Sequence, residues 1–138
     1  MQSGLPLGDD PDGRARVGWM KCFADGSLGS RTAALLADIE PEADRPLPPD
    51  RRRGVWLTEP SRLADLVGRA AAGGIATQIH AIGDAANRKA LDILEAAKQS
   101  SNSLSPHRIE HAQIVDALDV ASFGKLGIIA SVQPVHCT

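Results

Sequence analysis

The sequence has little cysteine and few aromatic residues. Its 138 residues include two cysteines, two phenylalanines, two tryptophans and no tyrosine. Cys22 and Cys137 lie far apart and belong to no Cys-x-x-Cys pair, which argues against a disulfide framework and favours a reducing compartment, the cytoplasm. With so few aromatic side chains, the chain also lacks a platform on which bases or sugars would stack.

Long apolar runs and an excess of one charge are also missing. No apolar run approaches the roughly 20 residues of a membrane-spanning helix, and residues 1–16 are polar and rich in glycine and proline, unlike a signal peptide. We expect these residues to form a loop or a disordered N-terminus. The net charge of −2 gives no electrostatic footprint for nucleic acid or for an anionic membrane.

Segments with the periodicity of strands and of helices alternate through residues 17–138. The pattern predicts strands at 17–23, 75–80, 108–112 and 128–132, and helices over 58–72, 84–98 and 116–126. Asp84 and Asp116 are predicted to cap the second and third helices, and the third is predicted to bury Ala117, Val120 and Ala121. This order calls for parallel strands joined by right-handed helical crossovers.

The same α/β order fits an open doubly wound sheet or half of an eight-stranded TIM-type barrel. No Gly-x-Gly-x-x-Gly follows a predicted strand and no Walker lysine motif is present, which weakens the nucleotide-binding forms of the open sheet. The connection between the first strand and Thr58 is long enough to indicate a functional loop or lid.

Three predicted strand ends carry groups suited to chemistry: Lys21, His80 and His111. If neighbouring strands are in register, these side chains converge, and two neutral imidazoles suit a divalent ion such as zinc. Hydrogen-bonded structural histidines remain an alternative. For Lys21 the alternative is an amine that reaches out of the strand toward water, or one paired with a carboxylate such as Asp25.

Other polar residues near these strand ends have two interpretations each. Asp25, Ser27 and Arg31 line a substrate pocket, or they form an Asx/Gly turn with a surface arginine. Glu110 is predicted to point to the opposite face of its strand from His111 and to pair with Arg108 or a helix. His107 is predicted to face solvent.

Four segments together resemble one enzyme family: Lys-Cys-Phe-Ala-Asp-Gly-Ser-Leu-Gly-Ser-Arg-Thr-Ala (21–33), His-Ala-Ile-Gly-Asp (80–84), Arg-Ile-Glu-His-Ala-Gln (108–113) and Ser-Val-Gln-Pro-Val-His (131–136). They are similar to the YtcJ-like branch of the metal-dependent amidohydrolase superfamily. The resemblance implies a (β/α)₈ barrel with a small β-sandwich, of which residues 17–138 would be about strands four to seven. It also implies hydrolysis of an amide-type C–N bond in a small molecule with one or two divalent metals, zinc being the expected ion.

The resemblance also implies roles for single residues. Lys21 matches the strand-four lysine that binuclear members carboxylate and use to bridge two metals, while His80 and His111 match the ligands of strands five and six. The place of His136 in its motif suggests contact with the substrate. The family's His-x-His pair and its strand-eight aspartate, the usual proton shuttle, have no counterpart in these 138 residues, so we expect this chain alone to be poorly active or inactive.

Two further hypotheses compete with the hydrolase reading. The chain is a non-catalytic half-barrel that binds a metal or ligand or serves in assembly, or it belongs to a barrel hydrolase with a lone catalytic histidine. A half-barrel leaves strand edges and one sheet face open. We therefore expect self-association, or closure by the missing remainder of the barrel.

Overall fold

The computed structural model describes residues 18–98 and 105–137. Its strands are β1 (Trp19–Phe23), β2 (Ala76–Ala81), β3 (Arg108–His111) and β4 (Ile129–Ser131), and its α-helices are α1 (Pro60–Ala72), α2 (Asp84–Lys98) and α3 (Ala117–Leu126). Two short 3-10 helices, η1 (Pro49–Arg51) and η2 (Pro134–Cys137), complete the elements. The predicted order and types of the main elements are confirmed.

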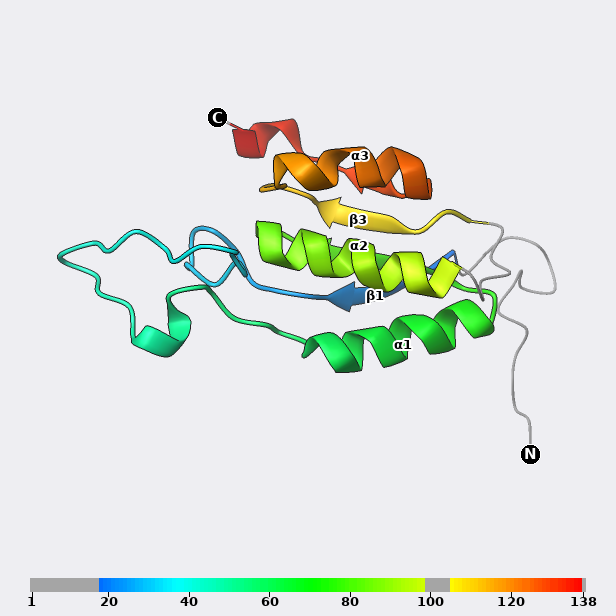
Figure 1. The fold of residues 1–138 in the computed structure, drawn as a ribbon, viewed down its shortest axis with the longest axis horizontal. Coiled ribbons are helices and arrows are strands. Elements are labelled where there is room, and N and C mark those ends of the chain that lie inside the picture. The colour runs from blue at the N-terminus through cyan, green and yellow to red at the C-terminus, as the bar shows by residue number, and fades with distance from the viewer. Residues whose placement is uncertain (1–17, 99–104, 138) are drawn as a thin grey trace.

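The four strands form one parallel sheet in the order β1-β2-β3-β4. The three helices cover the same face of the sheet (Figure 1), as expected when each new strand is added on the same side through the usual right-handed crossover. Buried aliphatic residues from the sheet and helices form the core there, including Leu63, Val67, Ile79, Leu94 and Ile109. The other face of the sheet is left partly open, and Phe23 is 49% exposed on it.

Local signals account for most helix ends. Pro60 occupies the first turn of α1, where its missing N–H costs nothing. The Asp116 carboxylate accepts a hydrogen bond from the Leu118 N–H at 2.9 Å, and Gly127 ends α3 in the left-handed conformation. The Asp84 carboxylate accepts from the N–H of Ala85 at the start of α2, at 2.9 Å.

The prediction for the buried face of α3 is wrong. Val120 is 59% exposed, Ala117 and Ala121 are exposed, and α3 buries no residue fully. Phe123 and Leu126 instead pack against the core. The helix packs against β4 and α2, and most of its other apolar positions stay exposed.

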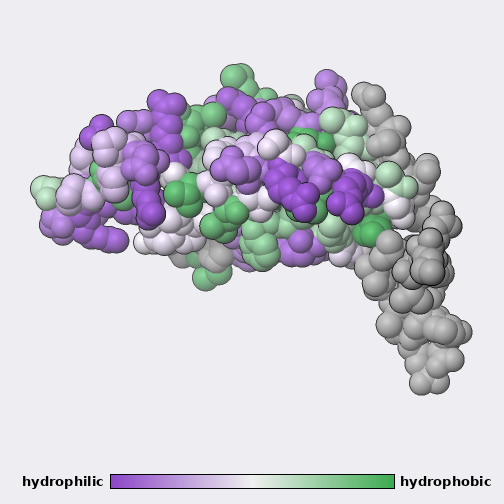
Figure 2. All heavy atoms as spheres, turned by 90° about the horizontal axis from the view of Figure 1, so that it is seen from below, coloured by the Kyte–Doolittle hydropathy of each residue, from purple (hydrophilic) through white to green (hydrophobic). Residues whose placement is uncertain are grey.

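Residues 24–59 form a long loop that projects beyond the carboxyl ends of the strands (Figure 1). Hydrophilic residues crowd the end of the molecule that this loop forms (Figure 2), and Arg53 pairs with Asp38 there at 2.8 Å. Backbone hydrogen bonds from Leu35 to Arg53 and from Ile39 to Arg52 draw its two arms together. In the described part of the chain, no helix is long and apolar enough to cross a membrane.

Gly83 permits a close approach between the β2–α2 turn and this loop. A Cβ atom at residue 83 would lie 1.9 Å from the carbonyl oxygen of Ala34. Replacing Gly83 with alanine is therefore expected to lower the free energy of unfolding by about 1–3 kcal/mol in urea titrations. Gly68→Ala in α1 is the control: no atom of the described residues lies within 4 Å of the added methyl, and we expect a gain of about 0.5–1 kcal/mol. Equal effects of the two substitutions would contradict the close contact.

Candidate metal centre

The register of the sheet places the predicted site residues on its open face. Phe23 is opposite His80, and His80 is opposite Glu110. Lys21 precedes Phe23 by two residues and therefore shares this face, one step further from the strand ends. Side chains of three neighbouring strands thus meet at the carboxyl edge of the sheet, where parallel α/β folds collect their chemistry.

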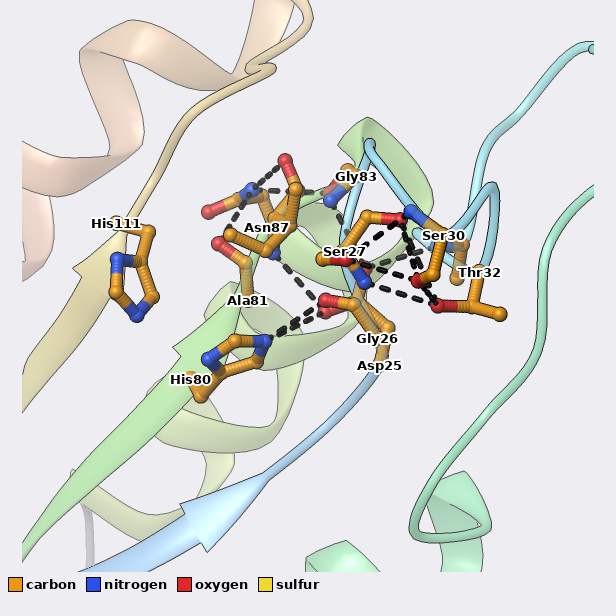
Figure 3. A network of polar contacts seen from close by, with 12 residues as sticks. Asp25, Gly26, Ser27, Ser30, Thr32, His80, Ala81, Gly83, Asn87 and His111 are labelled. Carbon is orange, nitrogen blue, oxygen red and sulfur yellow. Dashed lines mark hydrogen bonds and ion pairs between the residues drawn. The ribbon is translucent and has the colours of Figure 1, made fainter. Parts of the chain in front are cut away.

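Asp25 organises this edge from within the protein. Its side chain is fully buried, and its carboxylate accepts hydrogen bonds from the backbone N–H groups of Ala34, Ile82 and Gly83 at 2.8, 3.0 and 2.9 Å. One anion thus joins the end of β1, the long loop and the β2–α2 turn. Figure 3 shows the carboxylate between Gly83 and His80.

His80 is oriented by the loop that follows β1. Its Nε2 lies 2.9 Å from the carbonyl oxygen of Gly26 and 3.8 Å from Oδ1 of Asp25. A carbonyl oxygen only accepts hydrogen bonds, so Nε2 carries the proton. The lone pair of the neutral ring is then on Nδ1. This hydrogen bond to a backbone carbonyl is the kind of contact that orients histidine ligands in metal sites.

His111 reaches the same place by a change in backbone direction. In regular strand alternation it would lie on the opposite face from Glu110, but its φ is +75° and that of Ala112 is +42°. Such left-handed angles are uncommon for residues other than glycine and are concentrated at functional sites. They end the strand and let the imidazole lie beside His80, with the ring centroids 4.7 Å apart (Figure 3).

Gln133 fixes the protonation of His111. The Gln133 side-chain amide donates from Nε2 to the carbonyl oxygen of Ser131 at 3.2 Å, so its Oε1 is the atom that lies 2.6 Å from Nδ1 of His111. Nδ1 is therefore the donor, and the lone pair of the neutral ring is on Nε2. In each histidine, one ring nitrogen thus donates a hydrogen bond to an oxygen acceptor. In the neutral ring the second nitrogen, Nδ1 of His80 or Nε2 of His111, carries the lone pair.

Asn87 locks the turns that carry these groups. It is fully buried, and its Nδ2 lies 2.9 Å from the carbonyl oxygen of Gly83 and 3.0 Å from that of Ile114. It therefore connects the segment after β2 with the segment after β3. The positions of His80 and His111 relative to each other depend on this connection.

Lys21 has an amine that is easier to deprotonate than usual. Lys21 is an exposed residue of β1, but partial desolvation of its amine lowers its pKa; the Glu110 carboxylate raises the pKa and Arg108 lowers it. The amine lies 5.2 Å from the centre of the Phe23 ring. The alternative pairing with Asp25 has no support in the described contacts of that carboxylate, which are with backbone N–H groups and His80.

Glu110 lies on the same face as Lys21 and His80, which corrects the prediction of its direction. Glu110 was predicted to point away from the site. It keeps the regular strand alternation, and His111 is the residue that departs from it, through its left-handed backbone. The predicted pairing with a cation is confirmed, because Arg108 Nε lies 2.6 Å from the Glu110 carboxylate. Burial raises the pKa of Glu110, but hydrogen bonds from Ser131 and Gln78 and the charge of Arg108 outweigh it, and the net shift is downward.

The candidate substrate residues are placed as follows. Ser27 is exposed and forms a hydroxyl cluster with Ser30 and Thr32 (Figure 3). Arg31 is not a surface arginine, since only 9% of its side chain is exposed. His136 belongs to η2, but its side chain lies outside the described residues.

His107 is buried, at 8% exposure, so the prediction that it faces solvent is wrong. Its Nδ1 accepts the Thr77 N–H at 3.0 Å, which satisfies a backbone donor of β2 at the amino end of the sheet. Sequence alternation just before a strand does not reveal such a contact between neighbouring strands.

A pH dependence of stability follows from His107. Burial lowers its pKa, and Lys98 acts in the same direction. The unfolded chain therefore binds the proton more tightly, so stability is full above the unfolded pKa of about 6.5 and is lost as the pH falls through it toward the lower native value. We expect the urea midpoint to fall between about pH 7.5 and pH 5.5. His107→Asn, which keeps an acceptor for Thr77, is expected to flatten this dependence; an equally steep fall in the variant would assign it elsewhere.

In residues 18–98 and 105–137, no three or more histidine, cysteine, aspartate or glutamate side chains are grouped to hold a metal ion. The two histidines are therefore a pair. Lys21 lies on the same face of the sheet as His80.

Comparison with known proteins decides the family. A sequence model described as "Amidohydrolase family" matches residues 3–138. The chain belongs to the amidohydrolase family. The curated relatives that this amidohydrolase chain matches include Protein LONG AFTER FAR-RED 3 of Arabidopsis thaliana, 37% identical over 121 residues, and Putative amidohydrolase YtcJ of Bacillus subtilis (strain 168), 35% identical over 117 residues. The predicted family is confirmed.

Two solved structures are similar to this amidohydrolase chain. They are uncharacterized metal-dependent hydrolases of Pyrococcus furiosus and Pyrococcus horikoshii OT3, each 35% identical, with TM-scores of 0.72 and 0.73. The matches cover 94% of this chain but 25% and 24% of those chains. For the two curated relatives the coverage is 87% and 85% of this chain and 20% of each relative. The four-stranded unit is thus part of a TIM-type barrel, as predicted.

Gln133, Asn87 and the Gly26 carbonyl are site residues that the sequence did not single out for a role. Gln133 and Gly26 lie inside the motifs that identified the family, so motif membership was an available signal. Asn87 is in the first turns of α2, where an asparagine would ordinarily be solvated, and its zero exposure is visible only in the fold.

Proposed function

We propose that this chain forms part of a metal-dependent hydrolase and that His80 and His111 hold one divalent metal, with zinc as the expected ion. The whole enzyme would cleave an amide-type C–N bond in a small molecule. The similarity to metal-dependent hydrolases supports the first part. The bond type is supported by membership of the amidohydrolase family.

The observation that carries the proposal is the matched state of the two imidazoles. Each is held through one nitrogen by an oxygen acceptor, Gly26 O for His80 and Gln133 Oε1 for His111. Each neutral ring then has its lone pair on the other nitrogen, and the two rings lie side by side. Neutral imidazoles with a fixed tautomer are the form in which histidine binds zinc.

The chemistry of the donor set fits a divalent metal, which when bound would polarise a carbonyl group and lower the pKa of water. The residues of this chain would bind the metal and orient its ligands. Gly26 and Gln133 hold the imidazole protons away from the site, and Asp25 fixes the loop that carries Gly26. The long loop is placed to limit access of water at the carboxyl edge of the sheet.

Lys21 is proposed as a further ligand after carboxylation. Its lowered pKa increases the share of neutral amine, whose nitrogen attacks the carbon of carbon dioxide and loses a proton. The resulting carbamate offers anionic oxygen. We expect added bicarbonate to increase metal retention by the native chain and to leave a Lys21→Arg variant unchanged, as measured by metal analysis after dialysis. Bicarbonate dependence that persists in Lys21→Arg would contradict this role.

The proposal is tested by metal content. Dialysis against zinc is expected to load the native chain, whereas His80→Ala and His111→Ala should each lose most of the metal. His107→Asn is the matched control. His107 directly precedes β3 but lies at the opposite end of the sheet from His111, so this variant should retain native metal content. Equal metal in all four proteins would contradict the proposal, and circular dichroism checks that each variant is folded.

A second role, in assembly, is favoured by exposed apolar side chains along the open face and the β4 side. These are Trp19, Phe23, Val120, Ile129, Val132 and Val135. In the described chain both outer strands, β1 and β4, also have an unpaired edge. We expect the chain to self-associate in light scattering, or to bind the remaining barrel segments, and a monomer of ordinary thermal stability would contradict this.

A further inference from the structure

Arg31 has an unusual combination of strain, burial and missing partners. Its backbone φ is +57°, a conformation that a residue with a Cβ adopts at a cost. Only 9% of its side chain is exposed. Nη1 contacts the carbonyl oxygen of Arg45 and lies 3.6 Å from the Glu42 carboxylate, whereas Nε and Nη2 are buried and have no hydrogen-bond partner among residues 18–98 and 105–137.

The two unpartnered nitrogens define the kind of group that is missing. Nε and Nη2 carry N–H groups on one edge of the planar guanidinium, the edge that binds both oxygens of a carboxylate at once. Buried donors of a charged group are normally satisfied, because leaving them without an acceptor is costly. Because Nε and Nη2 of Arg31 are buried and unbonded in the described chain, they are available to an anionic acceptor from outside it.

Arg31 belongs to the same short loop that orients His80. Residues 26–32 form a closed loop, joined at its ends by the Gly26 N–H and the Thr32 carbonyl oxygen at 3.2 Å. The same loop donates the Gly26 carbonyl that holds His80 (Figure 3). A molecule bound at His80 and a group bound at Arg31 would thus be held by two points of one short, internally hydrogen-bonded loop.

The segment around Glu42, which contacts the Arg31 guanidinium, lies at the surface, where a bound anion could replace it. Residues 40–46 are exposed, and the Glu42 side chain is half-exposed. The Glu42 carboxylate lies 3.6 Å from Nη1 of the largely buried Arg31, beyond the distance of a good hydrogen bond, so the Arg45 carbonyl is the direct contact of this segment with the guanidinium.

We propose that Arg31 binds a carboxylate group of the substrate, so that the complete enzyme acts on amides that also carry a carboxylate, such as N-acylated amino acids. The proposal rests on the hydrolase function proposed above, which places a substrate at this edge of the sheet. A backbone or side-chain acceptor from another part of the whole protein would be the competing occupant, and it would leave no affinity for free carboxylates.

The test compares two probes that differ only in charge, on the full chain without metal. N-acetylglycine and its uncharged amide, N-acetylglycinamide, are titrated while the Arg31 Nε–H signal is followed by nuclear magnetic resonance. We expect a saturable shift with the acid and none with the amide. Arg31→Lys should bind the acid at least about tenfold more weakly, because a lysine cannot reproduce the bidentate contact.

Arg53→Gln is the matched control, because Arg53 lies in the same long loop but already pairs with Asp38, and its affinity should equal the native one. No response of the native chain to the acid, or equal responses to acid and amide, would overturn the proposal without reference to any variant. Metal content is measured separately on the same protein. Zinc binding without carboxylate discrimination would overturn only the Arg31 role, and carboxylate discrimination without zinc binding would overturn only the metal site.

Discussion

Replacing Asp25 with alanine is expected to lower the free energy of unfolding by about 3–5 kcal/mol, the largest loss of any single substitution considered. The carboxylate is fully buried and accepts three backbone N–H groups. Alanine would leave all three donors buried without an acceptor. Because they belong to the long loop and the β2–α2 turn, the substitution should also release the loop that orients His80.

Urea denaturation measures this loss, with Asp38→Ala as the control. Asp38 is a loop carboxylate that is half-exposed and pairs with an exposed arginine, so its removal should cost less than about 1 kcal/mol. Asp25→Asn keeps the shape and one acceptor oxygen and should fall between the two. A loss for Asp25→Ala no larger than that for Asp38→Ala would show that the three hydrogen bonds do not stabilise the fold.

Zinc is expected to stabilise the native chain strongly. A ligand that binds only the folded state at about 100 times its dissociation constant adds about 2.7 kcal/mol to the free energy of unfolding. Because His80 and His111 come from different strands, the unfolded chain holds no preformed pair. The urea midpoint should therefore rise with zinc concentration in the native chain and stay constant in His80→Ala and His111→Ala.

A substitution at Gln133 is expected to weaken zinc binding without abolishing it. Gln133→Leu removes the acceptor for Nδ1 of His111 but leaves both imidazoles in place. Loss of such a supporting contact weakens metal binding about 10- to 100-fold, so higher zinc should restore the same stabilisation. Stabilisation of the histidine variants equal to that of the native chain would place the zinc elsewhere.

Much of the fold was predictable because its signals are local. Strand runs, helical periodicity, Pro60 and Gly127 fix the order and type of the elements, and all are properties of short stretches of sequence. The buried face of α3 was missed because its sequence reads as an amphipathic helix in a closed barrel. In this chain Val120 and Ala121 stay exposed, and the helix packs through Phe123 and Leu126.

The site was predictable as a set of residues but not as a geometry. Alternation along β3 places Glu110 and His111 on opposite faces, and only the left-handed backbone at His111 brings its ring beside His80. Long-range contacts such as those of Asn87 and Gln133 depend on neighbours in space. One interpretation of Arg31 was a surface arginine, because the neighbouring sequence gives no sign that its guanidinium is buried.

The central claim is that His80 and His111 together bind a metal through defined nitrogens. Long-range proton–nitrogen correlation spectra of the isotope-labelled chain, recorded with and without zinc, test it directly. Without zinc, we expect the proton on Nε2 of His80 and on Nδ1 of His111. Zinc should then shift Nδ1 of His80 and Nε2 of His111. The opposite tautomers, or ring nitrogens that do not respond to zinc, would contradict the claim.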